Sequence, residues 1–274
     1  MINFAKLALA ILLCNFALSS MAQSDAQFEA YFKNDSVNGL KVSDGYETHN
    51  MGVIYKRSDV FFQLDLGIVS PDMHVYKNQF RVANRAFGEI VSLSVGRQNQ
   101  TYKDLELSYY LNLKTAGEYG IDSMQDWMHR VLALQPVNKV NDIVRMPNKV
   151  WVGVGGATVF DFPSDGSLFD NFGANLYFGT DRIELSPYVK NSNLLRDFKI
   201  TQELGLQLVP FNDIVSAPPI AASHRRLIPY IEIGLEFEVG AAEFFVRDRF
   251  SLPTIEDDNS IFGILYAGVN IQFD

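Results

Sequence analysis

"KDLELSYYLNLK", residues 103–114, alternates between apolar and polar side chains with a period of two. Successive side chains of a β-strand point to opposite faces of a sheet, so the stretch predicts a strand with one apolar and one polar face. The apolar positions are Leu105, Leu107, Tyr109, Leu111 and Leu113, and the polar ones are Asp104, Glu106, Ser108 and Asn112.

The same alternation recurs in "FFQLDLGI", residues 61–68, and in "IEIGLEFEV", residues 231–239. In the second stretch Glu232, Glu236 and Glu238 share one face, and three carboxylates are costly to bury in a dry core. The polar face must therefore meet water. It lies either outside a soluble β-sandwich or inside the wet lumen of an outer-membrane barrel whose apolar face meets lipid.

Strand length and number favour the barrel. A tilted strand needs about 9 to 11 residues to cross a bilayer, and bacterial barrels close with an even number of strands. We expect about twelve strands, at residues 38–46, 50–57, 60–69, 85–96, 103–114, 149–162, 171–180, 182–191, 196–209, 227–238, 241–250 and 260–273.

The connections and the C-terminus agree with this interpretation. Tight connections at residues 57–59 and 180–182 are typical of periplasmic turns, and longer ones at 70–84 and 210–226 are typical of extracellular loops. The chain ends with an alternating strand, "GILYAGVNIQFD". We therefore predict an all-β protein with a single closed antiparallel outer-membrane β-barrel over residues 38–274.

The N-terminus predicts export. Residues 1–22 have a lysine, an apolar run and small residues before Ala22, which is typical of a secretory signal peptide, and Cys14 is the chain's one cysteine. We expect residues 23–37 to be a polar N-terminal extension. A net charge of -9 without a basic stripe argues against a nucleic-acid partner.

One segment, "SMQDWMHRVLALQP" at residues 123–136, predicts a short helix in a long extracellular loop. Asp122 can cap its start with Gln125 three residues later, and Pro136 ends it. The helix carries His129 among apolar residues. Judged by its own surroundings, a lone histidine on such a helix is more often a packing residue than a ligand or a base.

Two local signatures point further. "GIVSPD" at residues 67–72 with "NRAF" at 84–87, followed by "QDWMHR" at 125–130, resemble in order and spacing the outer-membrane lipid A 3'-O-deacylases. The last segment matches that family's Gln-Asn/Asp-x-x-His-Arg pattern. The resemblance implies a twelve-stranded barrel and a calcium-assisted esterase that removes a 3'-acyloxyacyl chain from the lipid A of lipopolysaccharide at the outer leaflet.

The resemblance also implies roles for individual residues. His129 would activate water, because a neutral imidazole with a pKa near 6.5 can accept its proton. Oxygen ligands for calcium would come from the top of the first strand, where the family carries an Asn-Asp pair and the expected strands place Ser43 and Asp44. The pair at residues 34–35, Asn-Asp, is the competing candidate, but it would leave one strand too many before "FFQLDLGI".

Two further positions complete the implied site. Asn50 takes the place of a serine or threonine before the glycine of the second strand. Lys77 can fill a basic position that meets the substrate, and without the resemblance it is simply a solvated loop lysine.

The sequence also departs from the family pattern. Gln135 stands where the family has an acidic residue, and Val137 where it has a tyrosine. Glutamine can form hydrogen bonds but carries no charge to orient and stabilise an imidazolium. A non-enzymatic channel or structural barrel, including a degenerate member of the family, is therefore the main alternative. Closure removes free sheet edges, so we expect a monomer.

Overall fold

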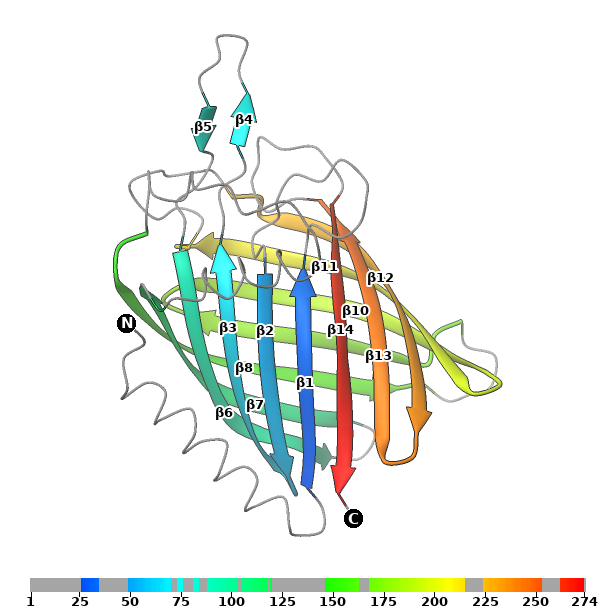
Figure 1. Ribbon diagram of the computed structural model, residues 1–274. Coiled ribbons are helices and arrows are strands. Elements are labelled where there is room, and N and C mark those ends of the chain that lie inside the picture. Colours follow the sequence, from blue (N-terminus) through cyan, green and yellow to red (C-terminus); the bar gives the residue numbers. More distant parts are fainter. Residues whose placement is uncertain are drawn as a thin grey trace, which may run out of the picture.

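The computed structural model describes residues 26–34, 49–69, 73–75, 81–83, 88–102, 105–117, 119, 146–162, 168–214, 224–252 and 262–273. Every regular element in these ranges is a strand (Figure 1). The strands are β1 (Ala26–Asn34), β2 (His49–Arg57), β3 (Val60–Val69), β4 (Met73–Val75), β5 (Arg81–Ala83), β6 (Gly88–Tyr102), β7 (Leu105–Gly117), β8 (Lys149–Asp161), β9 (Asn171–Gly179), β10 (Arg182–Leu195), β11 (Phe198–Asn212), β12 (Leu227–Val239), β13 (Ala242–Ser251) and β14 (Phe262–Phe273).

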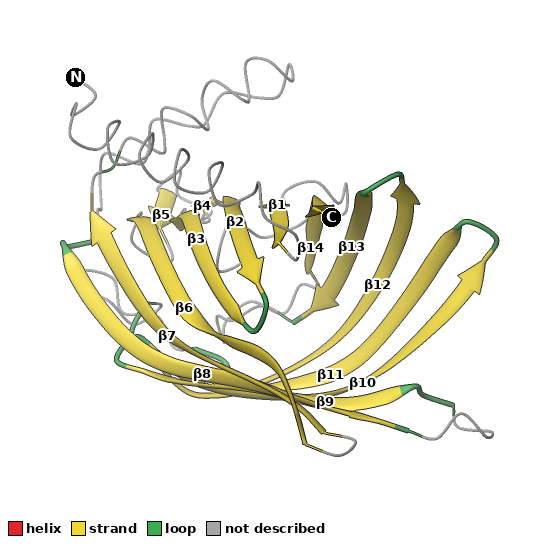
Figure 2. Cartoon of the chain, turned by 90° about the horizontal axis from the view of Figure 1, so that it is seen from below, coloured by secondary structure: helices red, strands yellow, loops and turns green. Residues whose placement is uncertain are grey.

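Twelve of these strands form one closed antiparallel barrel, in which β14 returns to pair with β1. Figure 2 shows the curved wall of strands from below. β4 and β5 form a separate two-stranded hairpin between β3 and β6, and it stands above one rim of the barrel (Figure 1). No helix within the described ranges is long and apolar enough to cross a membrane.

The wall has an apolar outer face and a polar inner face, as the alternation predicts. On β8, Val150, Val152 and Val154 are 65%, 55% and 50% exposed, whereas Trp151 between them is 1% exposed and faces the lumen. On β7, Leu111 faces outward while its neighbour Asn112 is buried in the lumen. The predicted fold class, a closed barrel with a polar interior, is confirmed. The predicted helix at 123–136 lies outside the described residues.

Most strand positions also agree with the predictions. Every predicted strand from 50–57 onward overlaps an observed one, and the prediction at 60–69 matches β3 at both ends. The hairpin of β4 and β5 was not expected, because its strands have three residues each, too few for an alternating pattern.

The prediction for the first strand is wrong. Residues 26–34, expected in an N-terminal extension over 23–37, form β1, which pairs with both β2 and β14. The segment 38–46, expected as the first strand, lies outside the described residues, as does the predicted signal peptide at 1–22. The polarity of "AQFEAYFKN" suggested an extension, but in a barrel strand half of the side chains face a wet lumen, so a polar composition does not exclude a strand.

The two ends of the barrel differ. Following the strands, the connections after β1, β3, β7, β9, β11 and β13 emerge at one end, which we call the loop-bearing rim. The opposite end has two-residue turns at 58–59, 196–197 and 240–241. The prediction that the tight connection at 180–182 is also a periplasmic turn is wrong. This connection joins β9 to β10 at the loop-bearing rim.

Lumen tyrosines lie flat against the wall because glycines stand opposite them on neighbouring strands. Tyr230 of β12 pairs with Gly205 of β11, and a Cβ built at Gly205 would overlap the Tyr230 ring. Tyr31 of β1 covers Gly52 of β2 in the same way. The ring replaces the missing side chain, so the inner wall is thickened without distorting the strands.

We therefore expect Gly205→Ala to lower the free energy of unfolding of the barrel by about 1 to 3 kcal/mol, because the added methyl group overpacks the lumen. Urea titration of the protein folded in lipid vesicles measures this change. Combining Gly205→Ala with Tyr230→Leu should cost less than the sum of the two single changes. Additive costs would contradict the contact.

Candidate functional site

Three connections at the loop-bearing rim carry the residues that the resemblance singled out. Ser43 and Asp44 lie between β1 and β2, Lys77 lies between β4 and β5, and His129 and Gln135 lie between β7 and β8. All five residues are outside the described ranges, so their roles stay predictions. The strands that carry these connections, β1, β2, β3, β6, β7 and β8, are consecutive in the wall. The topology therefore places the three connections side by side on one rim.

Asn50 is the predicted site residue that the structure describes. It is the second residue of β2, lies opposite Lys33 of β1 and Gly67 of β3, and is 7% exposed. Gly67 begins the "GIVSPD" signature. The fold thus brings Asn50 next to that signature, at the top of the lumen.

The position of β1 changes the expected calcium ligands. β1 ends at Asn34, which pairs with His49 and Leu265 at the loop-bearing rim. Only β1 and β2 precede "FFQLDLGI" among the described strands, so the argument against the pair at residues 34–35 fails. An Asn-Asp pair thus begins at the last residue of the first strand, at 34–35, and it stands as a candidate for the calcium ligands beside Ser43 and Asp44.

Both ends of the β7–β8 connection are held against β3 and β6. At its start, the backbone N–H of Tyr119 donates to Glu89 Oε2 at 2.5 Å, and Glu89 is 1% exposed. Tyr119 also packs on Ile68 of β3. At its end, the buried Met146 lies so close to Gly88 that a Cβ there would be 3.2 Å from the Met146 Cβ. The end of β3, beside "GIVSPD", and the start of β6, beside "NRAF", thus hold the two ends of the connection that carries "QDWMHR".

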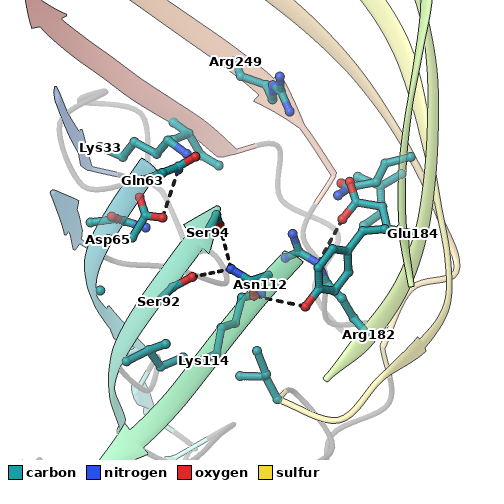
Figure 3. Close-up of a pocket in the computed structure, with 18 of the residues that line it drawn as sticks. Lys33, Gln63, Asp65, Ser92, Ser94, Asn112, Lys114, Arg182, Glu184 and Arg249 are labelled. Atoms are coloured by element: carbon teal, nitrogen blue, oxygen red, sulfur yellow. Dashed lines mark hydrogen bonds and ion pairs between the residues drawn. The ribbon is translucent and has the colours of Figure 1, made fainter. Parts of the chain in front are cut away.

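A cavity of about 360 Å³ lies in the lumen below this rim (Figure 3). On one of its walls, the Asn112 amide donates to Ser92 Oγ and Ser94 Oγ, both at 2.8 Å. The Tyr177 hydroxyl lies 3.2 Å from Asn112 Oδ1. These contacts link β6, β7 and β9 along one wall of the lumen and hold the polar groups in one arrangement.

Asp181 joins the same network from the turn between β9 and β10. Lys114 Nζ lies 2.6 Å from its Oδ2, and the Tyr177 hydroxyl lies 2.7 Å from its Oδ1. Burial by itself raises the pKa of the Asp181 carboxyl. The charge of Lys114, the hydrogen bonds from Lys114 and Tyr177, and the nearby Arg182 outweigh burial, so the pKa is below its ordinary value.

The wall formed by β10 to β13 carries ion pairs. Arg249 lies 2.8 Å from Glu232 and 3.8 Å from Glu203. Glu236 is held by Arg247 at 2.8 Å and by Lys199 at 2.9 Å. The glutamates of "IEIGLEFEV" that face the lumen here are thus neutralised by cations from neighbouring strands.

Sequence reasoning missed these lumen networks as sites. The signal was present, since Asn112 and the luminal glutamates stand at the polar positions of alternating strands. Which polar positions meet depends on strand register and on the curvature of the wall, and alternation specifies neither.

The predicted calcium ligands, Ser43 and Asp44, lie outside the described ranges. Within the described ranges, no group of three or more His, Cys, Asp or Glu side chains is arranged to hold a metal ion. A hard cation prefers oxygen ligands, and amide oxygens such as that of Asn50 are suitable. The carboxylate that would complete such a set is at residue 35 or 44, outside the described part of the chain.

Comparison with known proteins identifies a shared fold. No protein-family profile and no curated protein sequence matches the chain. Among solved structures, LpxR from Salmonella typhimurium matches with a TM-score of 0.72 at 12% identity, over 90% of this chain and 100% of that chain. The NanC porin (9% identity; 90% of this chain, 99% of that chain) and the translocator domain of the autotransporter NalP from Neisseria meningitidis (11%; 98% and 97%) both have a TM-score of 0.48, too low to carry an argument.

These observations establish the location of the protein. A closed barrel satisfies the backbone hydrogen bonds of every strand, and its apolar outer face is stable against hydrocarbon. The fold is shared with LpxR over the full length of that chain. The protein is a β-barrel of the bacterial outer membrane.

The Asp181 network predicts a pH dependence. Because the pKa of Asp181 is lower in the folded barrel than its ordinary 3.8, the carboxylate stabilises the fold above that pH and loses its contribution as the pH falls through the depressed pKa. Asp181→Asn should lower the free energy of unfolding at pH 7 by about 2 kcal/mol and remove this part of the acid dependence. Urea unfolding between pH 3 and 7 measures both effects, and Asp197→Asn, in an exposed turn at the other end, should change neither.

Proposed function

We propose that this barrel hydrolyses an ester-linked 3'-acyloxyacyl chain of lipid A at its loop-bearing rim. The observation that carries the proposal is the placement of all three connections with matching residues on consecutive strands of one rim. The fold that the chain shares with LpxR agrees with the barrel that the resemblance implies. Long loops mark the extracellular end of such barrels, so this rim would meet lipopolysaccharide in the outer leaflet. A monomer would suffice for this reaction.

The proposed reaction is hydrolysis by activated water. His129, as a neutral imidazole, takes a proton from water as the water oxygen adds to the ester carbonyl carbon. The carbon–oxygen ester bond then breaks, and the imidazolium returns its proton to the departing alkoxide. The products are a free fatty acid and a hydroxyl group on the remaining lipid A.

The remaining residues would hold the substrate and a cation. Calcium, when bound, polarises the ester carbonyl. The Asn-Asp pair at 34–35 would supply oxygen ligands, and Asn50 lies one residue from His49, the strand partner of Asn34. Lys77 would meet a negatively charged group of lipid A.

Because Gln135 stands where the family has an acidic residue, we expect the activity of this chain to be weak. An acidic side chain beside the imidazole would orient it and stabilise its protonated form, and a neutral amide provides only the hydrogen bond. The missing charge affects the rate of water activation rather than substrate binding.

The main alternative is a barrel that only conducts solutes, and the polar lumen favours it. Cation selectivity in such a channel would need luminal glutamates that are free to meet the ion. In the structure Glu232 and Glu236 are paired with arginine and lysine, which removes that basis.

Expression in a bacterium with defined lipid A tests the proposal. We expect mass spectrometry to show loss of one acyloxyacyl chain, and His129→Ala to abolish that loss. Chelation of calcium should have the same effect as the substitution. His224→Ala is the matched control, because His224 lies in the β11–β12 connection at the same rim and contacts the Val209 carbonyl at 3.1 Å.

An unchanged acylation pattern, with the barrel shown to be folded by its heat-modifiable gel mobility, would contradict the proposal. A large conductance of the purified protein in planar bilayers would then favour the channel. Activity that survives His129→Ala would contradict the role of that residue.

The altered residue beside the histidine gives a second prediction. Gln135→Glu should raise the rate of deacylation by about tenfold or more, because it restores the charge that stabilises the imidazolium. The rate is measured on purified lipopolysaccharide in detergent. Gln272→Glu, in β14 beside the 240–241 turn at the opposite end of the barrel, adds the same charge away from the loop-bearing rim and should not raise the rate.

A further inference from the structure

One cation that lines the lumen cavity has no ion-pair partner among the described residues. Lys114, Arg182 and Arg249 also line the cavity, but they pair with Asp181, Glu184 and Glu232, and Arg249 also lies near Glu203. Lys33 is the cation without such a partner, and because a charge acts strongly in a recess with low-dielectric walls, it favours an anionic ligand. The charged residues among the described lining are four cations, Lys33, Lys114, Arg182 and Arg249, and two carboxylates, Asp65 and Glu184.

Lys33 is the cation best placed to meet a ligand. Its Nζ lies 5.5 Å from the centre of the Tyr31 ring and 5.3 Å from that of Tyr266. Within the described part of the chain these rings hold Lys33, and no carboxylate forms an ion pair with it. Figure 3 shows Lys33 and Arg182 on opposite sides of the cavity, and Arg182 pairs with Glu184 at 3.1 Å, so a bound anion would lie on the Lys33 side.

The rest of the lining can recognise hydroxyl groups. Amides and serine hydroxyls both donate and accept hydrogen bonds, as a sugar hydroxyl does. The rings of Tyr110 and Tyr177 are stacked, with centroids 6.5 Å apart, and they offer flat apolar faces beside polar edges. The polar groups of this kind that line the cavity are Asn50, Gln63, Ser92, Ser94, Asn112 and Gln207.

We propose that the upper lumen binds an anionic sugar of about monosaccharide size, either a sugar phosphate or a uronic acid. The cavity volume of about 360 Å³ lies at the small end of the range for ligand sites. Lys33 holds the anionic group, and the amides, serines and tyrosines hold the hydroxyls. This site is inside the lumen and does not depend on hydrolysis at the rim.

Isothermal titration of the full-length protein, folded in detergent, tests the proposal. The probes are glucose 6-phosphate, glucuronate, glucose and inorganic phosphate. We expect saturable binding of glucose 6-phosphate or glucuronate, with weaker binding in high salt, and at least tenfold weaker binding of glucose and of phosphate alone. The comparison between the two anionic sugars distinguishes a phosphate from a carboxylate ligand.

Three lysine variants locate the site. Lys33→Met should weaken binding by about tenfold, because a charge-assisted hydrogen bond is lost, and Lys33→Arg should retain most of it. Lys56→Met is the matched control, because Lys56 pairs with Glu29 at 3.7 Å near the other end of the lumen and does not line the cavity. Heat-modifiable gel mobility confirms that each variant is folded.

Several results would overturn the proposal. If neither glucose 6-phosphate nor glucuronate binds, the proposal is wrong. Equal affinity for glucose 6-phosphate and inorganic phosphate would refute recognition of the sugar, and equal affinity for glucose and glucuronate would refute recognition of the charge. Equal loss in Lys33→Met and Lys56→Met would show that the cavity is not the site.

Discussion

The pairing of β1 with β14 is the interaction on which the rest of the structure depends. It runs from Ala26 opposite Phe273 to Asn34 opposite Leu265 and joins the two ends of the sheet. An open edge in hydrocarbon would leave several backbone groups without hydrogen bonds, at a cost of several kcal/mol each. Closure also fixes the position of β1 in the wall. It therefore fixes the point on the rim at which the β1–β2 connection begins.

Much of this fold could be predicted from the sequence, because lipid outside and water inside impose a period of two on each strand. β3, at 60–69, was predicted at both ends for this reason. β1 was missed because Gln27, Glu29 and Lys33 made the segment polar on average, and only its alternation marked it as a strand. The turn at 180–181 was misplaced because turn length alone does not say at which end of a barrel a turn lies.

The candidate site was less predictable, for a physical reason. Strand order brings Asn50 beside Gly67, which begins the "GIVSPD" signature. The lumen network of Asn112, Tyr177, Lys114 and Asp181 depends instead on contacts of β7 with β9 and with the turn after it, which are not neighbours of β7 in the wall, and these contacts follow from curvature and register. Local patterns contain neither quantity, so the lumen could be predicted to be polar, but its cavity could not.

The two ends of the lumen differ in how the side chains of the inner wall are used. Tyrosines seated on glycines and ion pairs such as Arg247 with Glu236 use polar side chains to bind strands to one another rather than to solvent. A channel that selects ions needs charges left for the ion, whereas here most luminal charges are already compensated by the wall. Among the described residues that line the upper cavity, Lys33 is the cation without an ion-pair partner, and it lies opposite Asn50 beneath the rim. This charge lies at the end that carries the long connections, which is where a site for a ligand would need it.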